Sequence, residues 1–384
     1  MVAPVRIAMV AGEASGDLLG AHLIAALRRH LPEARFFGIG GPRMQAAGFD
    51  ALWPAEKLAV HGYAEALRHY REIAGIRRRL LARLRADPPH VFVGVDAPDF
   101  NLWLEGRLKA SGIPAIHFVS PSIWAWRGSR IAKIKRAVTR MLALFPFEAP
   151  LYEAAGIPVS YVGHPLADVI PLDVDRAAAR EHLQLPPGTL IFALLPGSRQ
   201  GELRFMADTF IETARRLAIR FPAALFLVPL VSRETRALFE AALWRLGAQE
   251  LPIRLLFGNA QAALAASDAA LVASGTATLE AALLKTPHVI AYKLSPWSFR
   301  LMRHMGYQPW IGLPNILARR FVVAEFIQHE ATPDNLAQAL GNLALDGQVR
   351  ERLSRLFRAM HGVLRQGTAE KAAAAILPHL RGRV

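Results

Sequence analysis

Length, composition and charge exclude several classes of protein. The chain has 384 residues, of which 53% are hydrophobic and 20% charged, so it can form two domains and is too apolar to be disordered. It contains no cysteine, which excludes disulfides, thiolate metal sites and cysteine nucleophiles. The net charge of +15 indicates an anionic partner, whether nucleic acid, anionic lipid or a phosphorylated substrate, although solubility alone could explain it.

The hydropathy pattern predicts neither a membrane span nor a secretory signal. The longest apolar run, 223–231, is about half of the roughly 20 residues that a helix needs to cross a bilayer. The N-terminus has one early Arg and a short apolar run that ends at Gly12, without a basic region and a small-residue cleavage site. We therefore expect a cytoplasmic protein.

Apolar runs alternate with amphipathic ones along both halves of the chain. Strands are predicted at 5–11, 35–39, 90–95, 114–119 and 139–144, and again at 190–195, 224–231, 253–257, 268–273 and 287–292. Strands that alternate with helices form parallel sheets. We therefore predict an α/β protein of two Rossmann-like, doubly wound domains that face a cleft, at residues 1–165 and 166–349. A C-terminal helix near 350–384 is expected to pack back on the first domain.

The first polar motif follows the first predicted strand. Residues 12–17, Gly-Glu-Ala-Ser-Gly-Asp, form a Gly-rich turn into a helix, but they lack the dinucleotide fingerprint, and two carboxylates would repel a pyrophosphate. The turn suits hydrogen bonding to sugar hydroxyls or to an acceptor, and the alternative for Asp17 is helix capping. A nicotinamide or flavin cofactor is not expected.

Two further motifs follow later strands of the first half. Asp96 stands at the end of the strand predicted at 90–95, where a carboxylate can act as a general base; the alternative is an Asp that orders the loop. Asp99 is expected to cap the next helix. Beyond the strand predicted at 114–119, Trp124 and Trp126 offer aromatic faces for a sugar or an acyl chain.

The second half carries residues suited to phosphate. Arg199 follows a strand in the sequence Leu-Pro-Gly-Ser-Arg, and its planar guanidinium is predicted to contact a diphosphate. Residues 274–276, Ser-Gly-Thr, open a helix, so their backbone N–H groups and hydroxyls are predicted to bind an anion. Glu280 lies about one turn inside that helix and could reach ribose hydroxyls, unless it faces solvent.

Nine segments carry a resemblance to a known family. They are GEASGD, GPRM, GVDAPDFN, SPSIWAWR, FPFE, VGHPLAD, LLPGSR, SGTATLE and LPNILA, and they run from about residue 5 to residue 330. In order and spacing they resemble the lipid-A-disaccharide synthase family of Gram-negative bacteria. The resemblance implies a GT-B fold and an inverting transfer from UDP-2,3-diacylglucosamine to 2,3-diacylglucosamine 1-phosphate (lipid X), which yields a β-1,6-linked disaccharide and UDP.

The resemblance also implies roles for individual residues. Glu13 and Asp96 would be catalytic. The UDP donor would be bound by Arg199, Ser274, Gly275, Thr276, Glu280, Asn315, Glu325 and Gln328, and the acceptor or its acyl chains by Ser15, Asp99, Trp124, Trp126 and His61. No metal and no further cofactor are expected. The chain departs from the family pattern at His61, where Met is usual, and at Arg319-Arg320, which replaces a Gly-rich segment.

Both implied substrates are anionic amphiphiles, which gives the positive charge an interpretation. Residues 68–85 interleave Arg with Leu and Ile and could lie on an anionic lipid surface. Residues 297–305 are a second apolar and basic segment, unless they form a buried helix. We expect peripheral association with the inner face of the inner membrane, and a homodimer is compatible with the resemblance.

Two alternatives share part of these features. A UDP-sugar 2-epimerase would have the same two-domain plan and nucleotide site but a water-soluble substrate. A nucleic-acid-binding protein would share the charge, but the sequence has no zinc knuckle, RNA-recognition signature or basic tail. Nucleic acid is therefore not an expected partner.

Overall fold

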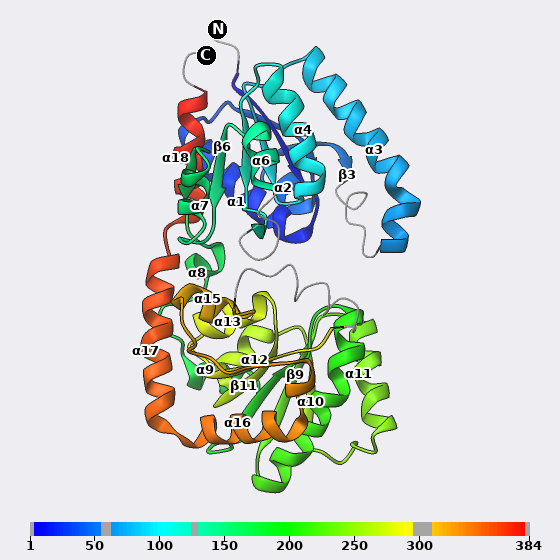
Figure 1. The fold of residues 1–384 in the computed structure, drawn as a ribbon, viewed down its shortest axis with the longest axis vertical. Helices are drawn as coiled ribbons and strands as arrows, with labels where there is room; N and C mark the ends of the chain where they lie inside the picture. The colour runs from blue at the N-terminus through cyan, green and yellow to red at the C-terminus, as the bar shows by residue number, and fades with distance from the viewer. Residues whose placement is uncertain (1–3, 55–62, 124–129, 295–308, 381–384) are drawn as a thin grey trace. The chain divides into compact units, whose positions relative to one another are not determined.

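The chain forms two compact units. The computed structural model describes residues 4–54, 63–123, 130–294 and 309–380, with only the backbone described for 63–70. Residues 1–168 and 364–384 make the first unit, and residues 169–363 make the second. In Figure 1, helix α18 (Thr368–Ile376), near the C-terminus, lies with the N-terminal elements of the first unit.

The first unit is a parallel sheet between layers of helices. Within the described residues its strands are β1 (Arg6–Ala11), β2 (Arg35–Gly40), β3 (Phe49–Pro54), β4 (Val91–Val95), β5 (Ala115–Phe118), β6 (Arg140–Ala143) and β7 (Val159–Tyr161). Their order is β3-β2-β1-β4-β5-β6-β7. The helices are α1 (Ala14–His30), α2 (Pro42–Ala46), α3 (Tyr63–Ala86), α4 (Pro98–Ala110), α6 (Ile131–Ala137), α7 (Ala149–Ala154), α8 (Pro165–Val169), which ends at the boundary, and α18 with a 3₁₀ turn after it, η4 (Leu377–His379).

The second unit repeats this plan. Within the described residues its strands are β8 (Ile191–Leu195), β9 (Leu225–Leu230), β10 (Ile253–Phe257), β11 (Ala269–Ala273), β12 (His288–Tyr292) and β13 (Glu325–Ile327), in the order β10-β9-β8-β11-β12-β13. The helices are α9 (Arg176–His182), α10 (Gln200–Arg220), α11 (Arg233–Arg245), α12 (Ala260–Ala266), α13 (Thr276–Leu283), α15 (Leu313–Ala318), η3 (Gln328–Glu330), α16 (Pro333–Leu345) and α17 (Gly347–Leu364).

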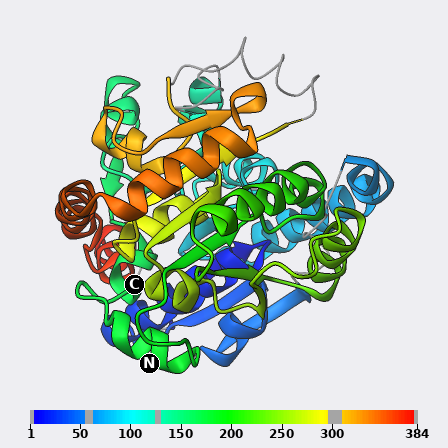
Figure 2. The ribbon, with the colours of Figure 1, turned by 90° about the horizontal axis from the view of Figure 1, so that it is seen from below.

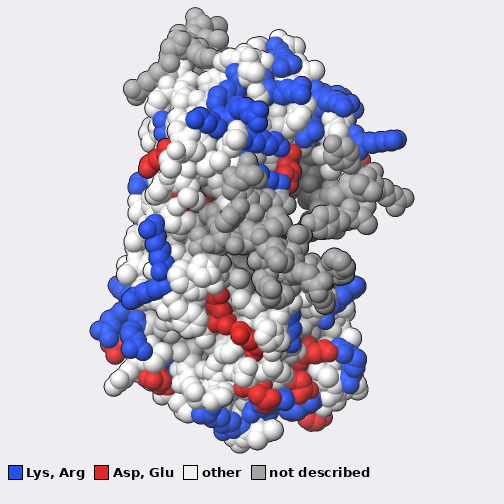
Figure 3. Space-filling view, viewed as in Figure 1, with Lys and Arg blue, Asp and Glu red and all other residues white. Residues whose placement is uncertain are grey.

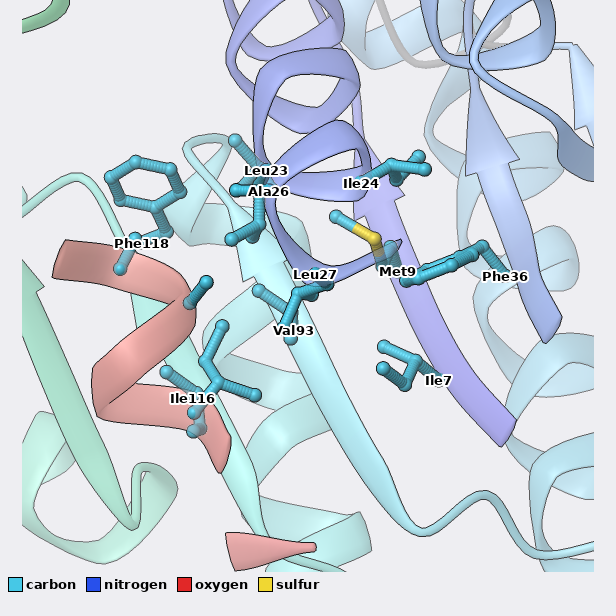
Figure 4. Packing of buried hydrophobic residues seen from close by; sticks show 14 of the residues in the cluster. Ile7, Met9, Leu23, Ile24, Ala26, Leu27, Phe36, Val93, Ile116 and Phe118 are labelled. Atoms are coloured by element: carbon cyan, nitrogen blue, oxygen red, sulfur yellow. The ribbon is translucent and has the colours of Figure 1, made fainter. Parts of the chain in front are cut away.

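The central strands form because their side chains are apolar on both faces. Every residue of β4, β8 and β11 is buried, as expected for parallel strands covered by helices on both sides. In the first unit, Met9 of β1 and Val93 of β4 pack against Leu23 and Leu27 of α1, and α18 covers the same cluster (Figure 4).

Two neighbouring helices contribute to the layer that covers one face of the second sheet. Figure 2 shows α10 and α16 side by side. Phe210 of α10 and Leu340 of α16 are fully buried in one cluster with Phe192 of β8 and Val228 of β9. Burial of such side chains contributes on the order of 2 kcal/mol each, so this layer stabilises the sheet of the second unit.

The prediction of two parallel-sheet α/β domains is confirmed. All ten predicted strands are present with ends shifted by no more than one residue. Strands β3, β7 and β13 were not predicted, and all three are edge strands. Edge strands are covered less completely, and the partly buried residues of β7 and β13 therefore do not form a continuous apolar run.

The division of the chain differs from the predicted residue ranges. The chain passes from the first unit to the second between Asp168 and Val169, whereas the predicted boundary followed residue 165. The second unit continues to Val363, whereas it was predicted to end at residue 349. The reason for the second difference is the apolar face of α17: Phe357 is fully buried in a cluster with Ile290 of β12. Only residues 364–384 return to the first unit.

His288 makes the stability of the second unit depend on pH. Burial lowers its pKa from 6.5 to about 4, although the hydrogen bond with the carbonyl of Thr286 opposes this shift. The unfolded chain therefore takes up a proton below pH 6.5, while the folded chain remains unprotonated at this side chain until about pH 4. This contribution to stability is complete above pH 6.5 and is lost as the pH falls through that window.

We predict that His288→Asn weakens this acid dependence. An Asn can keep a donor toward Thr286 but cannot be protonated, so the free energy of unfolding should change by roughly 1.4 kcal/mol less per pH unit across the window. Urea unfolding at a series of pH values measures the slope. His164, whose burial also lowers its pKa to about 4, should leave a residual dependence. An unchanged slope would exclude His288 as the titrating group.

Candidate active site

Each sheet has one point at which the chain reverses the direction of strand addition. In the first unit, β2 and β3 are added on one side of β1 and β4 to β7 on the other; in the second, β9 and β10 lie on one side of β8 and β11 to β13 on the other. Loops that follow the two central strands leave toward opposite faces, and ligands of such sheets bind where these loops diverge. These two switch points are where most of the predicted site residues lie.

The first switch point brings Glu13 and Asp96 to one edge of the sheet. Ala11 of β1 pairs with Val95 of β4, so the two carboxylates follow paired residues by two positions and one position. The start of α1, which follows Glu13, lies close to the end of β4, because a Cβ on Gly16 would meet the carbonyl of Val95 at 3.4 Å. Glu13 is exposed and Asp96 is partly exposed, and neither carboxylate is hydrogen-bonded to a described residue. Both are available to a ligand.

The turn that carries Asp96 has an unusual backbone. Asp96 and Ala97 have φ of 53° and 43°, and the β-branched Val119, beyond the neighbouring strand β5, has φ of 82°. Such conformations cost on the order of 1 to 3 kcal/mol each and tend to occur at functional sites. The buried Asn101 secures the turn, since its side-chain amide donates to the carbonyl of Asp96 at 2.8 Å.

Asp17 has a structural role that the sequence only partly anticipates. Its buried carboxylate accepts hydrogen bonds from the backbone N–H groups of Gly41, Arg43 and Met44 at 2.8 to 3.0 Å. Asp17 thus caps α2, whereas capping of its own helix was the sequence interpretation. A Cβ on Gly41 would lie 2.6 Å from the Asp17 carboxylate. The GEASGD and GPRM segments are therefore two halves of one packed contact.

The residues assigned to the acceptor are only partly described. Ser15 is exposed at the start of α1, and Asp99 is exposed at the start of α4. The expectation that Asp99 caps α4 is wrong: Ala97 occupies the N-cap position without a side-chain cap, and Asp99 pairs with Arg130 at 3.1 Å. His61, Trp124 and Trp126 lie outside the described residues.

At the second switch point, Arg199 is the N-cap of α10. Its side chain is 79% exposed and lies 3.4 Å from the carboxylate of Glu202. Glu202 also accepts from the backbone N–H groups of Ser198 and Arg199 at 3.1 and 3.3 Å. The carboxylate of Glu202 thus supplies a negative charge at the N-terminus of α10. The guanidinium of Arg199 remains exposed and is accessible to an external anion.

The loop after β11 presents the N-terminus of α13. Gly275 is the N-cap, with φ of 150° and open space where a Cβ would lie, so the backbone conformation and not crowding calls for glycine. Gly275 and Thr276 are exposed, and the first N–H groups of the helix can receive an anion. Glu280 lies further along α13, where Gln261 donates to it at 3.1 Å.

Asn315 and Glu325 hold the protein's own backbone. Glu325 accepts from the N–H groups of Ile311 and Gly312, both at 2.9 Å, and from the side chain of Asn315 at 2.7 Å. The fully buried Asn315 also binds the backbone of Val323. Their hydrogen-bonding groups are thus largely used within the protein, and they shape the loop before α15.

Gln328 secures the chain beyond β12. Its side-chain amide both accepts from the N–H of Leu294, at 2.8 Å, and donates to its carbonyl, at 3.2 Å. Gln328 itself has φ of 54°. Gln328 was predicted to bind the UDP donor, but like Asn315 and Glu325 its side chain is hydrogen-bonded within the protein and supports the backbone of a neighbouring segment.

Comparison with known proteins identifies the family. The model of the family described as lipid-A-disaccharide synthetase matches residues 7–377. The chain belongs to this family. A lipid-A-disaccharide synthase from Azoarcus sp. (strain BH72) is 64% identical over 375 residues, covering 98% of this chain and 96% of the relative. The protein is therefore a glycosyltransferase of lipid A biosynthesis.

Solved structures support the GT-B fold of this lipid-A-disaccharide synthetase family member. The calicheamicin glycosyltransferase CalG4 gives a TM-score of 0.60 at 17% identity, covering 100% of this chain and 99% of that one. UDP-GlcNAc 2-epimerase from Neisseria meningitidis gives 0.62 at 12% identity, covering 98% and 99%. At these identities the likeness concerns the fold alone.

Two residues that support the site loops, Asn101 and Glu202, were not predicted from the sequence. Asn101 belongs to the segment GVDAPDFN, but the burial of an amide inside α4 has no local signature in the sequence that would predict its role. Glu202 had a recognisable signal: a Glu three residues after the N-cap of a helix commonly reaches back to the N-cap backbone N–H.

We predict that Asp17→Ala destabilises the first unit. It would leave three backbone N–H groups without their acceptor, so the free energy of unfolding should fall by roughly 2 to 4 kcal/mol. Asp17→Asn keeps one acceptor oxygen and should lose less. Denaturant unfolding at neutral pH measures both. If Asp17→Ala were as stable as the parent but inactive, Asp17 would belong to the reaction and not to the fold.

Proposed function

We propose that this glycosyltransferase joins UDP-2,3-diacylglucosamine to 2,3-diacylglucosamine 1-phosphate with inversion at the anomeric carbon. The family match along residues 7–377 is the observation that carries the proposal. It is supported by the separation of the two sets of polar residues: carboxylates at the first switch point suit a sugar acceptor, and cationic and N–H groups at the second suit a nucleoside diphosphate.

The chemistry assigns one task to Asp96. Its carboxylate would take the proton of the acceptor's 6-hydroxyl as that oxygen attacks the anomeric carbon of the donor. The bond from this carbon to the diphosphate breaks in the same displacement, and attack from the opposite face gives the β-linked product. Among the described residues, no side chain is hydrogen-bonded to the Asp96 carboxylate. The direction in which this carboxylate points is therefore set by the strained backbone of its turn.

The leaving UDP gains negative charge, and the second switch point is suited to stabilise it. The N-terminus of α13 at Gly275 and Thr276 offers backbone N–H groups, and the exposed guanidinium of Arg199 can form two parallel hydrogen bonds to phosphate oxygens. Glu280 would reach the ribose hydroxyls. Asn315, Glu325 and Gln328 would act by shaping the surrounding loops. We expect no metal ion and no cofactor to take part.

The test is analysis of the product. The purified protein is incubated with UDP-2,3-diacylglucosamine and 2,3-diacylglucosamine 1-phosphate, and mass spectrometry together with NMR follows the products. A β-1,6-linked disaccharide 1-phosphate and one UDP per disaccharide are expected. An α-linked product would refute inversion, and isomerisation of a UDP-sugar without an acceptor would indicate an epimerase.

We predict that Asp96→Asn abolishes turnover but spares UDP binding. A general base acts in the transition state, so kcat should fall on the order of a hundred-fold to ten-thousand-fold. Calorimetry with UDP should give the parent affinity. Asp50→Asn, a change at an exposed carboxylate, is the matched control. Near-normal synthesis by folded Asp96→Asn protein would move the role to Glu13, and lost UDP affinity would place Asp96 on the donor side.

We also propose that the basic face of the first unit lies on the anionic inner-membrane surface. Figure 3 shows Lys and Arg gathered on the face that carries α3, α4 and α6, and Arg83, Lys133 and Arg136 are among the exposed residues. None of the helices in the described ranges is long and apolar enough to cross a membrane. Binding at the surface by charge would present the enzyme to lipid substrates.

Reversing these charges should therefore release the protein from anionic vesicles. We predict that the triple variant Arg83→Glu, Lys133→Glu and Arg136→Glu binds phosphatidylglycerol vesicles at least about tenfold more weakly, and that salt weakens parent binding in the same way. Co-sedimentation measures both.

A control of equal net charge separates this face from general electrostatics. Arg233→Glu, Arg352→Glu and Arg355→Glu change exposed residues of the second unit and should leave binding nearly unchanged. Equal losses in the two triple variants would refute a specific face, and no parent binding at low salt would refute the membrane proposal.

A further inference from the structure

A pair of ionisable side chains lies buried below the turn that carries Asp96. Glu105 belongs to α4 and His117 to β5, and both are fully buried. The Oε1 atom of Glu105 lies 2.7 Å from Nδ1 of His117. Neither residue is exposed to a ligand, and the proposed reaction gives neither of them a role.

The pair spans the strand that ends at Asp96. In the sheet, His117 is the register partner of Gly94, which stands two residues before Asp96. Glu105 reaches across Gly94 from the helix, because a Cβ on Gly94 would lie 2.2 Å from its Oε1 atom. The hydrogen bond therefore ties α4 to β5 directly over β4.

Asn101 extends this contact to the turn itself. It lies one helical turn before Glu105 on α4, and a Cβ on Gly94 would also approach its Cβ atom at 2.9 Å. Its amide donates to the carbonyl of Asp96 at 2.8 Å. The same face of α4 thus contacts His117, Gly94 and the Asp96 turn in succession.

Stability alone does not account for the pair. Among the described residues, Asn101 Oδ1, Glu105 Oε2 and His117 Nε2 are buried without a hydrogen-bonding partner, which costs free energy. Burial raises the pKa of Glu105, and the adjacent His117 opposes that shift only in part. Apolar side chains of similar volume commonly replace such a pair without loss of stability, and the surrounding core consists of apolar residues such as Phe92, Leu104 and Leu108.

The pair does, however, constrain the strained turn. Asp96 and Ala97 both have positive φ, and α4 starts directly after them. If α4 could shift along the sheet, this turn could relax toward an ordinary conformation and carry the Asp96 carboxylate with it. A hydrogen bond has a preferred length and angle, so the one between α4 and β5 opposes such a shift. Apolar packing is non-directional and would specify the position of α4 less sharply.

We propose that Glu105 and His117 are positioning residues for the glycosyl transfer: their buried hydrogen bond fixes α4 over β4 and β5 and thereby holds the Asp96 turn in its reactive conformation. The proposal rests on the proposed role of Asp96 as the base. It distinguishes this buried pair from ordinary core residues of the same helix.

The decisive variant is Glu105→Met, which fills a similar volume without an acceptor for His117. We expect kcat to fall about ten-fold to a hundred-fold, as displacement of a reacting group by about 1 Å can do, with KM changed much less. UDP affinity by calorimetry should be unchanged, because the predicted donor residues belong to the second unit. Glu105→Gln, which keeps an oxygen acceptor, should restore most of kcat.

Leu108→Ala provides the matched control. It removes a fully buried side chain of α4 and should destabilise the protein with little effect on kcat when measured well below its Tm. If Glu105→Met fails to fold, the double variant Glu105→Met with His117→Leu, which leaves no partner of the pair unpaired, takes its place with the same expected loss of kcat.

The outcomes separate the inference from the proposed function. Absence of disaccharide synthesis by the parent overturns the proposed function. Normal synthesis by Asp96→Asn leaves that function standing but overturns the role of Asp96 as the base, on which the inference rests. With an active parent and an inactive Asp96→Asn, a normal kcat for Glu105→Met overturns the inference alone. Equal losses in Leu108→Ala, or no recovery in Glu105→Gln, also overturn it, because general destabilisation or charge would then explain the effect.

Discussion

Parallel pairing between the two central strands of each sheet is the constraint on which both candidate sites depend. In the first unit Ala11 of β1 lies opposite Val95 of β4, and in the second Leu195 of β8 lies opposite Val272 of β11. A slip of one residue would turn every side chain of a strand toward the other face. Because both faces of these central strands are apolar and buried, burial alone opposes such a slip only weakly. The loops must therefore also fix the register. The loops that carry Glu13, Asp96 and Arg199 all start within a few residues of these pairs.

Carboxylates that bind backbone N–H groups hold several loops and helix starts of both units. Asp17 holds the start of α2, Glu202 the start of α10, and Glu325 the residues before α15. Asp168 does the same for Gly367 and Thr368 at the start of α18. These acidic residues stand in or near segments that resemble a catalytic family, yet they act on the protein's own chain. By contrast, Glu13 and Asp96 make no such bond to a described residue, which sets them apart as candidates for chemistry.

Local sequence was sufficient for the central architecture and insufficient for the contacts around the site. Continuous apolar runs predicted the central strands, because burial on both faces requires them, and the turns after these strands indicated the site loops. The edge strands β3, β7 and β13 were missed, since they are only partly buried and derive much of their definition from a neighbour. The partners of Asp17 and Glu325 lie about two dozen and a dozen residues away along the chain, and no local pattern specifies such contacts.

The return of the last helix to the first unit has a consequence for synthesis on the ribosome. Ala373 and Ile376 of α18 are fully buried in the same cluster as Leu23 and Leu27 of α1, so the core of the N-terminal unit lacks one wall until residues 364–380 have been made. The second unit is continuous in sequence from 169 to 363 and is therefore complete earlier. Domains generally fold in the order of their synthesis, but here the unit that is translated first is the one that is finished last.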